Sequence, residues 1–167
     1  MAKKKIVNVD PAAQAAYDKG RAHYRAQEYD LAFLCFLQAA DMGHAEAENF
    51  VGCCYEAGQG VARNDAEAAT RYRHAAWHGN VFAQYNLGVC YADGRGVPRD
   101  DKAAFEWFRL AAENGYSVAQ HRTGICCFGG IGTERNARDA VMWFRLAAQQ
   151  GDARARCDLG SCYYAGK

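Results

Sequence analysis

Cysteine is the most chemically versatile side chain in this sequence, and four of the eight cysteines recur at a fixed interval of 36 residues. Thiols in such a column could hold a zinc ion, form disulfides or supply a nucleophile. A free cysteine can equally serve as a small, buried apolar residue. The choice depends on the elements that carry the column, which consists of Cys54, Cys90, Cys126 and Cys162.

Other reactive residues form weaker patterns. His74 and His78 lie one helical turn apart, a spacing that suits a metal ion, but no carboxylate or cysteine partner is evident beside them. His121 and Cys157 fall in adjacent copies of a repeat, so a thiol–imidazole pair is a geometric possibility only. The stretch DGRGVPRDD lacks the lysine and the serine or threonine of a phosphate-binding loop. We therefore predict surface histidines, no catalytic residue, no metal and no cofactor.

Composition bounds the class of protein. The 167 residues carry a net charge of +1, which gives little support for binding to nucleic acid or to an anionic membrane. No apolar run approaches the length of a membrane span, and no apolar segment follows the lysines of MAKKKIVNVDP, as a secretory signal would require. Eight cysteines without such a signal favour a reducing compartment. We expect a cytoplasmic protein, with export as an effector without a classical signal as the alternative.

An internal repeat organises most of the sequence. Three copies align without gaps, and a shorter copy precedes them. Each full copy contains an opening alanine, an internal glycine, a glycine pair, an alanine pair and a closing glycine. In the copy that contains Cys90 these residues are Ala83, Gly88, Gly94 and Gly96, Ala111 and Ala112, and Gly115.

Each copy is predicted to form two helices. Apolar residues at intervals of four, such as Ala83, Leu87 and Tyr91, indicate the first helix, and the glycine pair ends it. A glycine inside a helix costs roughly 1 kcal/mol relative to alanine, so its repetition implies a close approach of the partner helix. The internal glycines are Gly52, Gly88, Gly124 and Gly160, and the N-caps expected for the second helices are Asn64, Asp100 and Asn136.

A helix pair of this size cannot bury its apolar face alone, so the pairs are expected to stack. The predicted fold is all-α, a right-handed α/α solenoid of about four and a half helix-turn-helix repeats. We expect residues 1–11 to form a disordered tail and residues 12–167 to form a single repeat domain. The predicted units are 12–46, 47–82, 83–118 and 119–154, followed by a half unit at 155–167.

The stretch AQYNLGVCYADGRGVPRDDKAAFEWFRLAAENGYSVA, residues 83–119, closely resembles the Sel-one-like repeat, a relative of the tetratricopeptide repeat. The resemblance covers about residues 12 to 167. It implies a curved, non-enzymatic scaffold or adaptor that binds other proteins, as in bacterial signalling, secretion or host interaction. The departures are Val51 for a leucine, Arg71 where the other full copies have Trp107 and Trp143, and Thr133 for a loop valine.

These helices favour a packing role for the cysteine column, whose position is usually small in the family. Stacked helices lie roughly 8–10 Å apart, whereas a disulfide needs Cα atoms within about 7 Å, and a column cannot converge on a zinc ion. A cysteine-rich subfamily bridges the two helices of each unit, but here only Cys35 lies in a second helix. We expect the column and Cys127 in the core, and Cys53 and Cys157 as the more exposed thiols.

In related repeats the first helices line a concave face. Three positions per helix face it, and here they vary between copies and are rich in aromatic residues, which anchor binding surfaces. We therefore expect a groove for an extended peptide or a helix of a partner protein, with packing against neighbouring first helices as the competing role. The predicted groove residues are Tyr17, Arg21, Tyr24, Asn49, Glu56, Tyr85, Val89, His121, Ile125, Phe128 and Tyr164, with Cys53, Ala92, Cys157 and Ser161 at the remaining positions.

The last predicted helix lacks the polar cap that usually closes a solenoid, because it carries Leu159, Tyr163 and Tyr164. Either one of its faces is an interface, for example for self-association, or the chain derives from a longer array. The alternatives to an adaptor are therefore a self-associating structural module and a thiol-dependent hydrolase.

Overall fold

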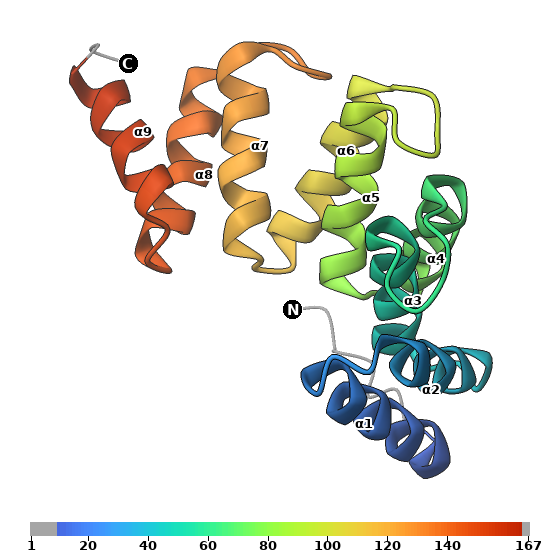
Figure 1. Ribbon diagram of the computed structural model, residues 1–167. Coiled ribbons are helices and arrows are strands. Elements are labelled where there is room, and N and C mark those ends of the chain that lie inside the picture. Colours follow the sequence, from blue (N-terminus) through green and yellow to red (C-terminus); the bar gives the residue numbers. More distant parts are fainter. Residues whose placement is uncertain (1–9, 165–167) are drawn as a thin grey trace. The chain divides into compact units, whose positions relative to one another are not determined.

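The computed structural model of the chain describes residues 10–164, apart from the side chain of Tyr163. Over this range it contains nine helices and no strand, and its contacts divide the chain into two compact units, Met1–His78 and Gly79–Lys167 (Figure 1). The first unit holds α1 (Pro11–Arg25), α2 (Tyr29–Asp41), α3 (Ala45–Ala57) and α4 (Asp65–Trp77). The second unit holds α5 (Val81–Asp93), α6 (Asp101–Glu113), α7 (Ser117–Gly129), α8 (Ala137–Gln149) and α9 (Ala153–Tyr164).

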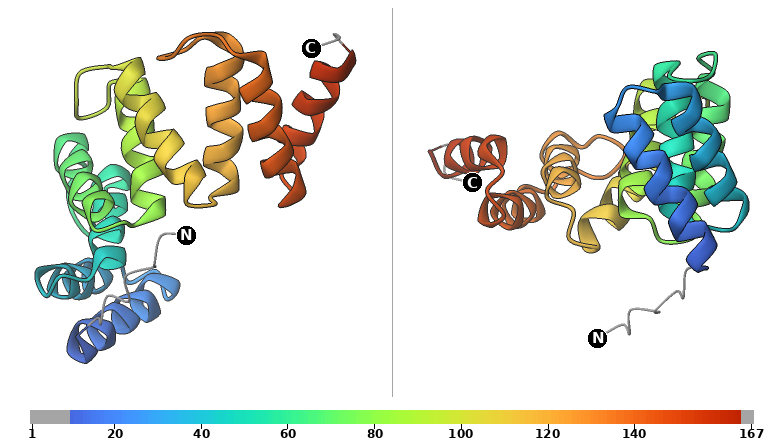
Figure 2. Two further views of the ribbon diagram at one scale, coloured as in Figure 1. Left: turned by 180° about the vertical axis from the view of Figure 1, so that it is seen from behind. Right: turned by 60° about the horizontal axis from the view of Figure 1, so that its bottom comes forward.

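The helices are arranged as sequential antiparallel pairs. Each odd-numbered helix from α1 to α7 packs against the even-numbered helix that follows it, as the views in Figure 2 also show. Within each unit, contacts of α2 with α3, of α6 with α7 and of α8 with α9 join successive pairs. The predicted all-α fold of repeated helix pairs is confirmed.

The predicted helix ends are also confirmed. The side chains of Asn64, Asp100 and Asn136 accept hydrogen bonds from free amides at the start of α4, α6 and α8. Gly58 and Gly94 adopt the left-handed conformation that ends α3 and α5. These local signals fix the length of each helix, and therefore which residues face the partner helix.

The N-terminal boundary differs slightly from the prediction. Residues 1–9, most of the expected tail, lie outside the described residues. Pro11 already begins α1, and the carboxylate of Asp10 caps that helix by accepting a hydrogen bond from the amide of Ala12 at 2.8 Å. Proline suits this first position because its missing N–H would have no partner there.

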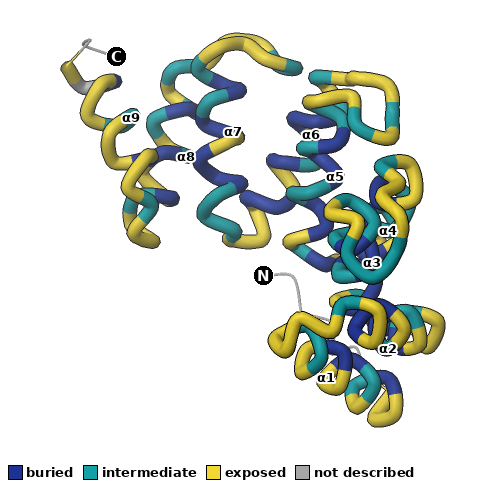
Figure 3. The backbone as a smooth tube through the Cα atoms, viewed as in Figure 1, coloured by how far each residue is buried: buried dark blue, intermediate teal, exposed yellow. Residues whose placement is uncertain are grey.

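The cysteine column lies in the core, as predicted. Cys54, Cys90, Cys126 and Cys162 are between 1% and 7% exposed, and none of the eight cysteines, which all lie within the described range, forms a disulfide. Figure 3 shows that buried residues run along α7, whereas α9 is largely exposed. The column therefore fills space between helices as a small apolar residue would.

Candidate interaction surfaces

The first helices of the second unit carry a half-buried apolar surface. It consists of Tyr85 and Val89 on α5 and Ile125 and Phe128 on α7, and we call these four residues the α5/α7 surface. All four side chains pack against the buried cluster that contains Phe108 and remain partly accessible. These residues were predicted for the groove, and they combine an anchored position with exposed apolar area.

Three other predicted groove residues are buried, so the expectation that they are exposed is wrong. Tyr17 stacks on the ring of His44, with 4.4 Å between the centroids, and is 5% exposed. Burial, assisted by nearby Glu46, raises the pKa of Tyr17 to about 12. Asn49 is 7% exposed. These side chains stabilise the first unit from within.

His121 is the third buried residue, and its partner was not foreseen. Its Nε2 lies 2.7 Å from Oδ2 of Asp158 on α9, and its side chain is 7% exposed. The sequence suggested Cys157 as a neighbour, but the structure gives His121 the adjacent residue, Asp158, as its polar partner. The pair links α7 to α9 and does not activate a thiol.

The remaining predicted residues of the first unit are accessible to different degrees. Arg21 is exposed, and its guanidinium lies 5.7 Å from the ring centroid of Tyr17. Tyr24 is half-buried and donates a hydrogen bond from its hydroxyl to Gln59 at 2.9 Å. At the other end of the chain, Tyr164 is 97% exposed.

Glu56 and Cys53 meet the hydroxyl of Tyr72, which crosses from α4 to α3. The residues equivalent to Tyr72 in the next two copies are Phe108 and Phe144, so among the three full repeats only the first carries a hydroxyl at this position. Tyr72 donates to Oε2 of Glu56 at 2.6 Å and lies 3.5 Å from the sulfur of Cys53. Of the two thiols expected to be the more exposed, Cys53 is half-buried and Cys157 is exposed.

Burial keeps most of the shielded thiols protonated at neutral pH. It raises the pKa of Cys54 to about 12 and that of Cys126 to about 11. It also raises the pKa of Cys53 and Cys127. Because the thiolate is the nucleophile, a raised pKa opposes catalysis by any of these four residues.

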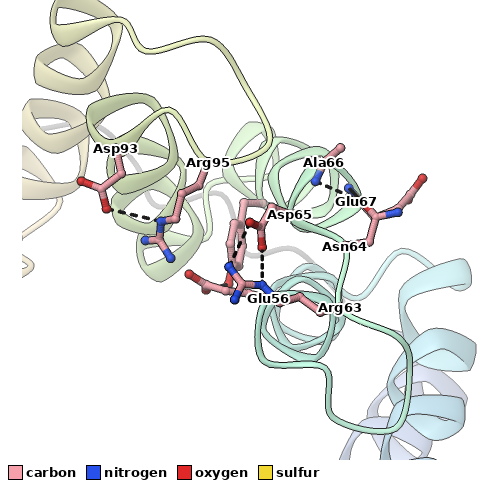
Figure 4. Close-up of polar contacts among 9 residues, drawn as sticks. Glu56, Arg63, Asn64, Asp65, Ala66, Glu67, Asp93 and Arg95 are labelled. Atoms are coloured by element: carbon pink, nitrogen blue, oxygen red, sulfur yellow. Dashed lines mark hydrogen bonds and ion pairs between the residues drawn. The ribbon is translucent and has the colours of Figure 1, made fainter.

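The loops between the two helices of a repeat are held by local ion pairs. Arg63 donates hydrogen bonds to both carboxylate oxygens of Asp65, each at 3.0 Å (Figure 4). Arg99 donates to both oxygens of Asp101, at 3.0 and 3.3 Å. In the third copy Ala137 replaces the aspartate. There the guanidinium of Arg135 lies 5.6 Å from the ring centroid of Phe128 and adds a charge beside the α5/α7 surface.

A hollow of about 340 Å³ lies in the first unit, where α3 begins and α4 ends. Glu48, His74, Trp77 and His78 help to line it. Glu48 is only 8% exposed, and both of its oxygens lie within 3.5 Å of Nη1 of Arg71. The sequence showed Arg71 as a departure from the repeat but did not reveal Glu48 as its partner, or as the carboxylate beside His74.

The stacked helix pairs define a helical-repeat protein of the solenoid class. The family model for the Sel1 repeat matches residues 12–44, 45–72, 81–116 and 117–152. The chain therefore belongs to the Sel1 repeat family. No curated protein matches the chain.

Two solved structures extend this result. A protective antigen of uropathogenic Escherichia coli with an SLR fold is 36% identical, with a TM-score of 0.89 over 92% of this chain and 34% of that one. A Sel1 repeat protein from Oxalobacter formigenes is 35% identical, with a TM-score of 0.86 over 90% of this chain and 62% of that one. The chain thus spans about a third of the first relative and less than two thirds of the second. The predicted solenoid class is confirmed.

Two features are absent from the described part of the chain, a membrane-spanning helix and a group of three metal-ligating side chains. No described helix is both long and apolar enough to cross a bilayer. Among the described residues, no group of three or more His, Cys, Asp or Glu side chains is placed to hold a metal ion.

Proposed function

We propose that the chain is a non-enzymatic adaptor that binds a peptide or helix of a partner protein on its first helices. The observation that carries the proposal is the α5/α7 surface. Its residues differ from copy to copy, while the alanine, glycine and cysteine columns around them stay the same. A fixed frame with a variable, partly apolar surface is typical of repeat proteins that bind other proteins.

The energetics of the α5/α7 surface fit this role. Side chains that are already packed on one side lose little conformational freedom when a partner covers the other side. Tyr85 and Phe128 offer aromatic area of the kind that dominates binding energy at interfaces. The guanidinium of Arg135 beside Phe128 favours a partner segment that carries an acidic residue next to an apolar one.

The setting of this adaptor is also part of the proposal. The relatives of known structure include bacterial proteins, one of them described as a protective antigen. We infer a role in bacterial signalling, secretion or host interaction. Eight cysteines without a disulfide favour a reducing, cytoplasmic location.

Self-association through α9 is the second candidate function. Gly160, on the face that packs against an aromatic ring in the earlier repeats, has no heavy atom within 4 Å of a Cβ position. Cys157, Ser161 and Tyr164 on the same helix are exposed. Sedimentation of the full chain at several concentrations tests this candidate, because self-association through α9 predicts a mass that rises with concentration and that Tyr164→Glu returns to that of a monomer.

Affinity capture with matched variants tests the adaptor proposal. The test variant is Val89→Ser/Ile125→Ser/Phe128→Ser, and the control is Leu110→Ser/Met142→Ser/Leu146→Ser, which removes exposed apolar residues from α6 and α8 of the same unit. The proposal expects a protein that the wild-type chain and the control capture from a lysate of the source cells and that the test variant loses. Equal capture by all three folded proteins would exclude the α5/α7 surface as the binding site.

A further inference from the structure

The hollow at the start of α3 and the end of α4 is lined by two histidines that lie one helical turn apart, His74 and His78. His78 donates its backbone N–H to the carbonyl of His74 at 3.3 Å, so the helical turn between the two residues is complete. Residues four apart on a helix lie on one face, with about 5–6 Å between their Cβ atoms. Both histidines line the same hollow, together with the exposed Trp77. Two imidazoles in this arrangement are a recognised way to hold a metal ion on a helix.

A buried carboxylate orients the first of these rings. Nδ1 of His74 lies 3.3 Å from Oε1 of Glu48, whose side chain is 10% exposed. Arg71 holds Glu48 in place and balances its charge. When a carboxylate accepts the Nδ1–H of a histidine, the lone pair is left on Nε2, and this is the usual outer partner of a metal-binding histidine.

The other repeats show that this cluster is not required by the fold. The positions of Glu48 and His78 are occupied by Gln84 and Asn114 in the second full copy, where the two amides bond each other at 3.2 Å. In the third copy Gln120 and Gln150 make the equivalent bond at 2.8 Å. The position of His74 is leucine in both copies, at Leu110 and Leu146. The first full repeat therefore replaces an amide pair and a leucine by a carboxylate and two imidazoles.

We propose that His74 and His78 bind a late first-row divalent metal ion, with Glu48 as a positioning residue. His44 also lines the hollow, but both of its ring nitrogens are engaged, by the amide of Ala47 and by Gln14. No three ligating side chains of the described residues are placed to hold a metal ion, so water or a side chain of a partner protein completes the coordination. Because Arg71 balances the charge of Glu48, the site attracts an ion through neutral imidazole nitrogens. Such ligands favour Zn²⁺, Ni²⁺ or Cu²⁺ over Mg²⁺ and Ca²⁺, which prefer oxygen.

The test is titration of the full chain, without any polyhistidine tag, with ZnCl₂ and with NiCl₂ near pH 7.5, followed by calorimetry. The expected result is binding of one ion that His74→Leu or His78→Asn abolishes. Both variants carry the residue found in another copy of the repeat, so they are expected to fold. Glu48→Gln should weaken binding by about 10- to 100-fold, the usual effect of removing an outer carboxylate, and MgCl₂ should give no signal.

A matched control is available on α1. Nδ1 of His23 lies 2.6 Å from Oε2 of Glu28, but no second histidine stands one turn away. His23→Ala should leave zinc binding unchanged, as should Cys157→Ser, which removes the exposed thiol. A second measurement needs no variant. In the NMR spectrum of the wild-type chain, zinc should change the chemical shifts of the imidazole nitrogens of His74 and His78. The proposal is overturned if the wild-type chain binds neither ion, or if binding survives His74→Leu and His78→Asn.

Discussion

The ring of Phe108 on α6 occupies the space that a side chain at Gly88 on α5 would need. A Cβ placed at Gly88 would lie 2.7 Å from Cδ1 and 2.7 Å from Cε1 of that ring. The same relationship joins Gly52 to Tyr72 and Gly124 to Phe144. The internal glycine is therefore kept because an aromatic ring of the second helix packs directly on the backbone of the first.

Gly88→Ala should destabilise the protein by about 1–3 kcal/mol. The added methyl group forces the buried ring of Phe108 or the backbone of α5 to move, which is the usual cost of overpacking, and this cost exceeds the helix propensity that alanine gains. Urea unfolding of the wild-type chain and the variant measures the difference. Gly160→Ala is the control, because nothing lies within 4 Å of the new Cβ. That variant should be neutral or up to about 1 kcal/mol more stable, and equal losses at both positions would contradict the packing explanation.

Stability should fall as the pH rises above about 9, partly because of the cysteine column. The ordinary pKa of these thiols is 9.0, and burial raises the pKa of Cys54 to about 12 and of Cys126 to about 11. Between those values the unfolded chain has released protons that the native chain retains, so each thiol lowers the free energy of unfolding by up to about 1.4 kcal/mol per pH unit. Below pH 9 the contribution of both thiols is fully present.

Urea unfolding at a series of pH values from 7 to 10.5 measures this slope. The variant Cys54→Ala/Cys126→Ala loses both titrating groups, so its stability should depend less steeply on pH than that of the wild-type chain. The comparison uses slopes and not absolute stabilities, because the substitutions also remove core volume. Identical slopes for the two proteins would show that these thiols are not buried as described.

Asp158→Ala should loosen the attachment of α9. The substitution removes the oxygen that lies 2.7 Å from Nε2 of His121 and leaves that buried ring nitrogen without this partner. A buried polar atom left without its partner costs about 1–3 kcal/mol. Hydrogen exchange should accelerate in α9 but not in α5. Unchanged protection of α9 would mean that apolar contacts alone hold this helix.

The sequence was sufficient to predict the helices and the core because these depend on local, repeated signals. Asn64 caps α4, Gly58 ends α3 and Cys54 fills the core as expected. Each of these roles follows from one residue and its immediate neighbours, and the repetition supplies several independent readings of each. The family membership follows from the same columns.

The surface was harder to predict because exposure depends on the angle between successive helix pairs. Tyr17 occupies a groove position in the repeat, yet it stacks on His44, the N-cap of a helix in the next pair. The pairing of Glu48 with Arg71 joins residues 23 positions apart on neighbouring helices. No spacing rule of a single helix reveals such contacts, although the replacement of a repeated tryptophan by Arg71 was a signal that this region is specialised.

Site-specific photo-crosslinking tests the central claim, that the first helices form the partner-binding surface. A photoreactive amino acid is placed at Val89 on α5 in one protein and at Leu146 on α8 in another, and both are expressed in the source cells. The adaptor account predicts a crosslink to the same partner protein from Val89 and none from Leu146. A partner that crosslinks from Leu146 alone would contradict it and would place the interface on the second helices.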